Sequence, residues 1–333
     1  QRASRAGLAL ALILAILVVA VVVVLSAAYA SLTAGLPSIQ SLPILLESRD
    51  GMLLQPTSLY DRSGRNLLYK LENPGIQRRY LLLDPQQTES LAPQLVQVVI
   101  TLFDPDFWQH PGFDAQRLAQ IEPATLAERL VNDLLLETEP ANLRRALRMR
   151  LLAAQVTAQF GRARVLEWYL NSASFGHLAY GAESAAQLYL GKTASKLNLP
   201  EAALLAAALE APALNPLDAP QAALEHQQWV LDRLLERGSI GAEQREQARE
   251  YIYTPLALPA APEQPARAFT SLVLEQLSNR LGRSRLERGG LRIVTTLDLE
   301  LQVQVACTLQ AQLIRLQGGS TSPLSTCQAA RLL

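Results

Sequence analysis

The chain has no excess of charge and few of the residues that build metal or thiol sites. Its 333 residues carry 30 basic and 30 acidic side chains, so the formal net charge is zero. Without a basic excess there is no long-range attraction for nucleic acid, and no nucleic-acid partner is expected. The chain has three histidines and two cysteines, without metal-ligand spacing, and no glycine-rich phosphate loop. Zinc-finger, P-loop and Ser-His-Asp chemistry are therefore excluded as interpretations.

The two cysteines, Cys307 and Cys327, both lie near the C-terminus. Outside the cytoplasm such a pair either forms a disulfide or stays as two free thiols. The spacing alone leaves both arrangements open.

One long apolar run stands at the N-terminus. Residues 6–30 contain no charged side chain, and a helix needs about 20 apolar residues to cross a bilayer. A cleaved signal peptide has a shorter apolar run of ~7–15 residues, so we expect an uncleaved anchor over residues 8–30. Arg2 and Arg5 precede the run, whereas residues 30–40 contain no basic residue. The positive-inside rule then places residues 1–7 in the cytoplasm and the bulk of the chain outside.

Turn residues and apolar spacing divide the rest of the chain. Asp61–Gly64 between two apolar stretches predicts a hairpin turn. Proline and alanine gather at residues 256–266 and indicate a linker. We expect these parts in order: a linker (31–55), a hairpin-like segment (56–80), a mainly helical domain (81–255), a Pro/Ala linker (256–268), a small α/β segment (269–317) and a tail (318–333).

The helical domain has its own internal pattern. A helix is predicted over 93–102, and Leu143, Leu147, Leu151, Ala154 and Ala158 predict one apolar face of a second helix. Residues 197–209 are apolar enough to be buried on all sides, and two more helices follow within 219–253. Beyond the linker we expect a helix over 269–281, then a turn, a short strand and a helix start within 289–302.

Residues 165–192 carry a specific resemblance. They resemble glycosyltransferase family 51, the peptidoglycan transglycosylase domain of class A penicillin-binding proteins, and two flanking segments (60–64 and 288–302) are similar to that group as well. The resemblance implies a lysozyme-like, mainly α fold behind a transmembrane helix in a bacterial cell membrane, and inverting polymerisation of lipid II. The matching residues that we expect to be structural are His110, Gly112, Tyr169, Asn171, Phe175, Gly176, Tyr180, Gly181 and Lys192.

The family's first motif, Glu-Asp-x-x-Phe-x-x-His-x-Gly, is present without its glutamate. Asp104 and His110 match, but Phe103 stands where the family has its general base. Phenylalanine has no group that accepts a proton, and losing a general base typically costs ~10²–10⁴ in rate. His110 matches a family histidine. Its expected role is packing and hydrogen bonding, and the alternative role is catalysis.

Two further motifs are altered. In the family's Gly-Gly-Ser-Thr-Ile-Thr-Gln-Gln stretch, only Thr125 survives among the expected pyrophosphate contacts, and Glu122-Pro123 replaces the glycine pair whose N–H groups approach phosphate. In the Arg-Lys-x-x-Glu motif Arg145 is kept, but Met149 replaces the glutamate.

The third motif bears on both metal and phosphate. The resemblance implies a divalent metal, Mg or Mn, yet its carboxylate is missing, and a thioether is a poor ligand for Mg²⁺. Arg145 and Arg148 belong to a cationic helix that either meets phosphates or forms a solvated basic face.

Two hypotheses remain open at this stage. One is a degenerate member that keeps the fold, contacts the bilayer, lipid II or nascent glycan, or a cell-wall synthesis protein, and has little or no activity. The other is a working glycosyltransferase with a relocated base at Asp104, Glu122 or Glu128. No Ser-x-x-Lys set suited to a transpeptidase follows, so that domain is not expected. Because the chain starts at Gln1, a fragment of a longer protein is a third reading.

Overall fold

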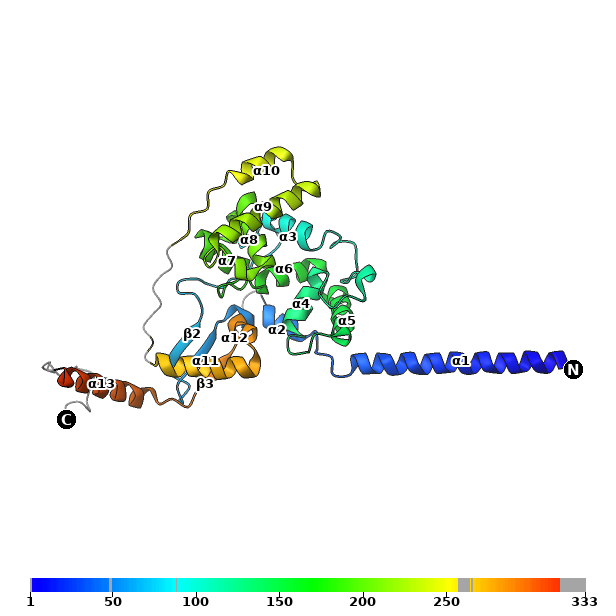
Figure 1. Ribbon diagram of the computed structural model, residues 1–333, viewed down its shortest axis with the longest axis horizontal. Helices are drawn as coiled ribbons and strands as arrows, with labels where there is room; N and C mark the ends of the chain where they lie inside the picture. Colours follow the sequence, from blue (N-terminus) through cyan, green and yellow to red (C-terminus); the bar gives the residue numbers. More distant parts are fainter. Residues whose placement is uncertain (1, 48–49, 88, 257–263, 265, 318–333) are drawn as a thin grey trace.

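The computed structural model describes residues 2–47, 50–87, 89–256, 264 and 266–317. Its first helix, α1 (Arg2–Thr33), projects from a helical body (Figure 1). Within it, Ala11–Thr33 is 23 residues long and apolar enough to cross a membrane. Side chains such as Leu14 and Val24 are about two-thirds exposed, at 66% each. A helix that is apolar on all sides and uncovered by protein fits a bilayer better than water.

The segment predicted as a plain linker, residues 31–55, contains structure of its own. Helix α2 (Ser41–Leu46) packs beside the main body, with Leu42 and Leu46 fully buried. Burying two leucines stabilises the segment by about 3–6 kcal/mol before the loss of chain entropy. The linker prediction was wrong here because three closely spaced leucines supply an apolar face that the prolines obscured.

The predicted hairpin is confirmed. Strands β1 (Thr57–Tyr60) and β2 (Leu67–Leu71) pair antiparallel, with Thr57 opposite Leu71. Strand β3 (Arg292–Val294) adds to β1 in parallel, with Leu59 opposite Ile293, so that the strand order is β2-β1-β3. The hairpin and the C-terminal segment therefore share one sheet although more than 200 residues separate them.

Asp61 organises the hairpin turn. Its carboxylate accepts hydrogen bonds from the Ser63 hydroxyl and the Asn66 side-chain amide, each at 2.7 Å. These bonds hold the pKa of Asp61 at about 2.

The turn is expected to loosen in acid. Because the pKa is lowered in the folded chain, the contribution of Asp61 to stability is present above its ordinary value near 3.8 and is lost as the pH falls towards about 2. Amide exchange of residues 62–66 should therefore accelerate in that window, and Asp61→Asn should flatten the dependence. Equal acid sensitivity in both proteins would contradict this assignment.

The main body is an assembly of helices and short 3₁₀ turns (Figure 1). The α-helices are α3 (Pro93–Phe103), α4 (Leu126–Leu134), α5 (Leu143–Phe160), α6 (Arg162–Ser172), α7 (Ala182–Leu190), α8 (Leu199–Glu210), α9 (Pro220–Glu236) and α10 (Ala242–Arg249). The 3₁₀ turns are η1 (Met52–Leu54), η2 (Ala115–Arg117), η3 (Ala194–Lys196) and η4 (Pro212–Leu214). The predicted mainly α class and the burial of α8 on all sides are confirmed.

The predicted apolar face of α5 is wrong. Leu143 is 52% exposed, while Ala146, Met149, Ala153 and Val156 are among the buried residues of α5. Both sets recur every three or four residues, so periodicity alone does not choose between them. The packing of α5 against α4 and α6 selects the second set.

The C-terminal segment follows its prediction. Helix α11 (Arg267–Leu281) and the short α12 (Arg283–Arg288) precede β3, and α13 (Leu299–Leu316) follows it. Cys307 on α13 is disulfide-bonded, so it is not a free thiol, whereas Cys327 lies outside the described residues. Most of the Pro/Ala linker and all of the predicted tail also lie outside them.

Candidate functional site

The end of α3 opens on a cavity of about 350 Å³, which we call the α3–α4 cavity. Four of the residues singled out from the sequence line it, together with an acid and a base from the loop before α4. These six are Phe103, Asp104, His110, Thr125, Asp114 and Arg117. The structure therefore brings together the first two family motifs around the position of the missing glutamate.

Asp104 is fully engaged in this cavity. One carboxylate oxygen accepts from Nε2 of His110 at 2.8 Å, and the other accepts from the backbone N–H of Leu126 at 3.0 Å. Nδ1 of His110 in turn accepts from the backbone N–H of Gly112 at 3.0 Å, so Nε2 carries the proton. This carboxylate is 4% exposed, and its two hydrogen bonds join α3 to α4.

Thr125 caps α4 at the edge of the α3–α4 cavity. Its hydroxyl accepts from the backbone N–H of Glu128 at 3.1 Å and donates to the carbonyl of Gly112 at 2.8 Å. A Cβ on Gly112 would lie 2.4 Å from the Thr157 hydroxyl, so only glycine fits at this crossing. The two family residues thus hold the loop before α4 against α5.

The other two candidate bases, Glu122 and Glu128, are not among the residues that line the α3–α4 cavity. Glu122 is exposed. Glu128 is fully buried, accepts from the N–H of Ala124 at 2.7 Å and lies 3.6 Å from Arg150. Burial raises the pKa of Glu128, while the Ala124 N–H and Arg150 oppose the rise. Arg150 also donates to the carbonyls of Arg117 and Gln120.

An arginine covers the residue that replaces the general base. The guanidinium carbon of Arg129 lies 5.0 Å from the centre of the Phe103 ring, a cation–π distance. The same guanidinium interacts with the buried Tyr169 hydroxyl and with Asp133. Burial raises the pKa of Tyr169 and of Asp133, which Arg129 opposes in both cases. We call this group the Phe103–Arg129 stack.

Met149 lies in the apolar core beneath this site. It is 1% exposed and belongs to the same buried cluster as Phe103 and Phe107. The thioether of Met149 and the ring of Phe103 offer no oxygen donor to a divalent ion, so these positions do not fit the metal that the family resemblance implied. Among the described residues, no three His, Cys, Asp or Glu side chains are grouped to hold a metal ion.

The two arginines predicted to bind pyrophosphate have different partners within the protein. Arg145 donates to the Asn132 side chain at 2.7 Å and lines a separate cavity. Arg148 is 2% exposed, donates to the carbonyls of Ala34 and Gly35 at 2.8 Å each and pairs with Glu139 at 2.9 Å. Arg148 therefore holds the chain just after α1 and has little capacity left for a phosphate.

The separate cavity has a volume of about 650 Å³ and lies between α5, the end of α4 and α12; we call it the α5–α12 cavity. Arg288 of α12 donates to the Asp133 carbonyl and pairs with Glu137 at 3.0 Å. Ser284 of α12 also donates to Glu137. A C-terminal helix thus forms one wall of a cavity whose other walls belong to the main body.

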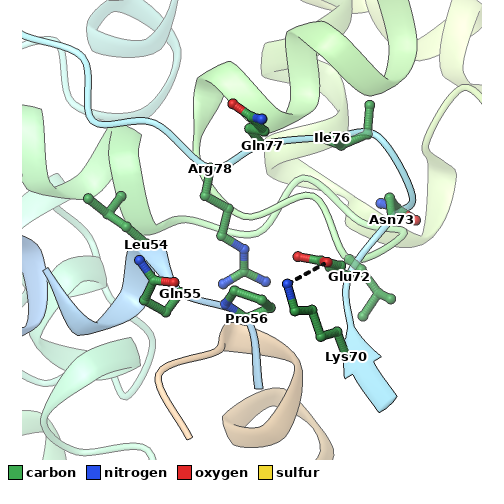
Figure 2. A pocket seen from close by; sticks show the side chains of 10 residues that line it. Leu54, Gln55, Pro56, Lys70, Glu72, Asn73, Ile76, Gln77 and Arg78 are labelled. Atoms are coloured by element: carbon green, nitrogen blue, oxygen red, sulfur yellow. Dashed lines mark ion pairs between the residues drawn. The ribbon is translucent and has the colours of Figure 1, made fainter. Parts of the chain in front are cut away.

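Arg78 joins α12 to the main body. It donates to the carbonyls of Leu53, Glu287 and Arg288, and its guanidinium carbon lies 5.1 Å from the Tyr180 ring centre. Burial lowers the pKa of Arg78 to about 10. Figure 2 shows its side chain pointing towards Pro56, beside the Lys70–Glu72 ion pair, in a third cavity of about 270 Å³.

Several of the remaining family matches make contacts within the protein. Asn171 exchanges hydrogen bonds with the backbone of Leu81, and Lys192 pairs with Glu201 at 2.6 Å. Gly176 and Gly181 both have positive φ, and a Cβ there would lie 2.1 Å from the Pro212 carbonyl and 2.7 Å from the Asn171 carbonyl. Phe175 is fully buried.

Several residues of the site were missed from the sequence. Arg129 lies four residues after Thr125 and four before Asp133, so helical spacing on α4 was a usable signal. Asp106 and Arg237 also line the α3–α4 cavity. No local sequence signal predicted that Arg237 lines the α3–α4 cavity or that α12 lines the α5–α12 cavity.

Comparisons with known proteins agree with the motifs. Residues 77–235 match the transglycosylase family. Penicillin-binding protein 1A of Aquifex aeolicus (strain VF5) is 34% identical over 74% of this chain and 34% of its own length. Penicillin-binding protein 1A of Escherichia coli (strain K12) is 29% identical over 78% of this chain and 31% of its own length. This chain therefore spans about a third of the length of these relatives.

A solved structure is also similar. The crystal structure of penicillin-binding protein 1A from Haemophilus influenzae matches at 20% identity and a TM-score of 0.36, over 70% of this chain and 25% of that one.

Proposed function

Since residues 77–235 belong to the transglycosylase family, we propose that this chain is a membrane-anchored, glycosyltransferase-type protein of peptidoglycan synthesis with little or no catalysis of its own. In this proposal α1 spans the bacterial cell membrane with a cytoplasmic N-terminus, and the body lies outside. Its ligand is lipid II or nascent glycan, and a cell-wall synthesis protein is a further partner. Support for the anchor comes from the length and exposure of the apolar helix.

One observation carries the loss of catalysis. The Phe103–Arg129 stack occupies the place where the family has its general base. An arginine is protonated at any working pH and phenylalanine accepts no proton, so neither residue supplies the base. The loss of that step alone removes ~10²–10⁴ in rate.

The relocated bases offered by the sequence are poor substitutes. Asp104 already accepts two hydrogen bonds, Glu122 is not among the residues lining the cavity, and Glu128 is buried against Arg150. Asp106 and Asp114 do line the α3–α4 cavity and are the carboxylates that an active enzyme would use. They define the alternative function, a slow glycosyltransferase.

Labelled lipid II separates the two functions. The full chain in detergent is expected to form no polymer. An intact penicillin-binding protein 1A, assayed in a separate reaction under the same conditions, is expected to form polymer. Binding of lipid II is followed in parallel on vesicles with and without it. Polymer that disappears in Asp104→Asn, Asp106→Asn, Asp114→Asn, Glu122→Gln or Glu128→Gln would overturn the proposal and identify the base.

A further inference from the structure

Helix α13 carries an exposed apolar face. Five large apolar side chains on this face are between 49% and 77% exposed: Leu301, Val305, Leu309, Leu313 and Leu316. The first four follow one another at intervals of four residues, and side chains with this spacing form a ridge along one side of a helix. Such a ridge packs into the groove between two ridges of another helix. We call these five residues the α13 ridge.

The opposite side of α13 is already covered. Cys307 and Ala311 lie on that side and are each 8% exposed. Cys307 is also disulfide-bonded, so its sulfur is engaged within the chain. The α13 ridge is therefore the side of this helix that is available for a further contact.

The α13 ridge contains no charged side chain. The helix has one acid, Glu300, and one base, Arg315. Each precedes a ridge leucine by one residue, which is a rotation of about 100° around the helix axis, so neither side chain joins the ridge. In a two-fold contact between parallel helices each residue meets its own copy, and any charge would meet a like charge. An uncharged ridge satisfies the requirement of such a contact.

A lipid surface fits α13 less well than a second copy of the chain does. Helices that lie on membranes are rich in Lys and Arg on their polar face, whereas α13 has Arg315 and four glutamines there and along its flanks. Figure 1 shows α13 leaving the body on the side opposite to α1, with both helices running in the same direction along the chain. Two copies anchored through α1 in one membrane would therefore hold their α13 helices parallel.

The size of the ridge suits a dimer. Its five side chains each expose on the order of 100 Å², so two copies would together bury about 1,000 Å², the lower limit expected of a specific interface. Gln302, Ala306 and Gln312 lie on the same side of the helix and add to this area. Glutamine amides at the rim of such a contact keep access to water, which is typical of the edge of an interface.

From the exposure, spacing, charge and direction of this helix we propose that two copies of the chain associate through their α13 ridges as a parallel, two-fold dimer. Val305 and Leu309 of one copy then face the same residues of the other. The proposal goes beyond the proposed function and takes from it only the anchoring role of α1. It requires neither lipid II nor catalysis.

The test is sedimentation equilibrium of the full chain in density-matched detergent. The unchanged chain is expected to sediment with twice the mass of one chain. Leu309→Glu and Leu309→Lys should each weaken the dimer about tenfold or more, because like charges meet at the two-fold axis. An equal mixture of these two variants should regain the dimer, because opposite charges then meet. Val303→Glu is the matched control on the same helix, since Val303 is exposed but lies on the Cys307 side, and should leave the dimer unchanged.

Three results would overturn this proposal. The unchanged chain could be a monomer, or its dimer could persist in both Leu309→Glu and Leu309→Lys, which would place the contact elsewhere. The mixture could also fail to regain the dimer, as expected of antiparallel helices, in which Leu309 meets Val305. Lipid II binding by the same variants is expected to be unchanged, so a failure of the dimer and a failure of the proposed function are told apart.

Discussion

Restoring the family glutamate by Phe103→Glu alone is expected to leave glycan synthesis undetectable. The new carboxylate would lie beneath the Arg129 guanidinium, whose carbon is 5.0 Å from the present ring centre. A neighbouring cation stabilises the charged carboxylate and lowers its pKa, which weakens it as a base. The ion pair would also hold the side chain away from an incoming sugar hydroxyl.

Removing the arginine at the same time should change the outcome. Phe103→Glu with Arg129→Gln is expected to exceed Phe103→Glu alone by ~10²-fold, the lower end of what a general base contributes, because the glycine pair before Thr125 stays missing. Initial rates with labelled lipid II measure the difference. Phe103→Gln with Arg129→Gln is the matched control, since it has the same shape without a carboxylate. Equal rates for the glutamate and glutamine pairs would show that Arg129 does not block a base.

Met149→Glu is expected to destabilise the fold and not to restore activity. The side chain is 1% exposed and packs in the apolar core, so an unpaired carboxylate there would be costly or would become protonated. Replacing Phe103 and Met149 by glutamate would therefore not recreate the family site, because the residues around Met149 are apolar. A restored enzyme would need new polar partners for that position.

Arg148→Met is expected to destabilise the helical body by ~3–5 kcal/mol, the usual cost of breaking a buried ion pair. It removes the 2.9 Å pair with Glu139 and the two hydrogen bonds to the carbonyls of Ala34 and Gly35. Denaturant unfolding of the detergent-solubilised chain measures the loss. Spin labels on α1 and α5 should at the same time report a broader distance distribution, because Arg148 orients the anchor.

Arg144 provides the matched control on the same helix. It is exposed and, among the described residues, donates only to the Ser31 carbonyl, at 2.9 Å, so Arg144→Met should cost less than about 1 kcal/mol. Arg148→Lys should fall between the two, because an ammonium keeps the charge and cannot reach both carbonyls and Glu139 in the same plane. Equal effects of Arg144→Met and Arg148→Met would contradict a specific role of Arg148 at the anchor.

The spacing of apolar and turn residues predicted the structure correctly where a segment's own sequence determines its conformation. The α3 helix was predicted over 93–102 and found as Pro93–Phe103, and the hairpin around Asp61–Gly64 formed as expected. Pattern failed where two faces of one helix were equally periodic, as on α5, where Leu143 is exposed and Met149 is buried. It failed again at residues 41–46, where burial of leucines outweighed the linker appearance.

The sequence by itself determined the apolar anchor, the helical class of the body and the absence of carboxylates at Phe103 and Met149, because composition and short-range spacing suffice for each. Only the tertiary structure decided that Arg129 covers Phe103, that Arg148 faces the anchor and that α12 closes a cavity of balanced charge. Each of these depends on contacts between segments distant in the chain, such as Arg148 with Ala34 and Arg78 with Arg288. Spacing along the sequence carries no information about which of several arginines meets which distant partner.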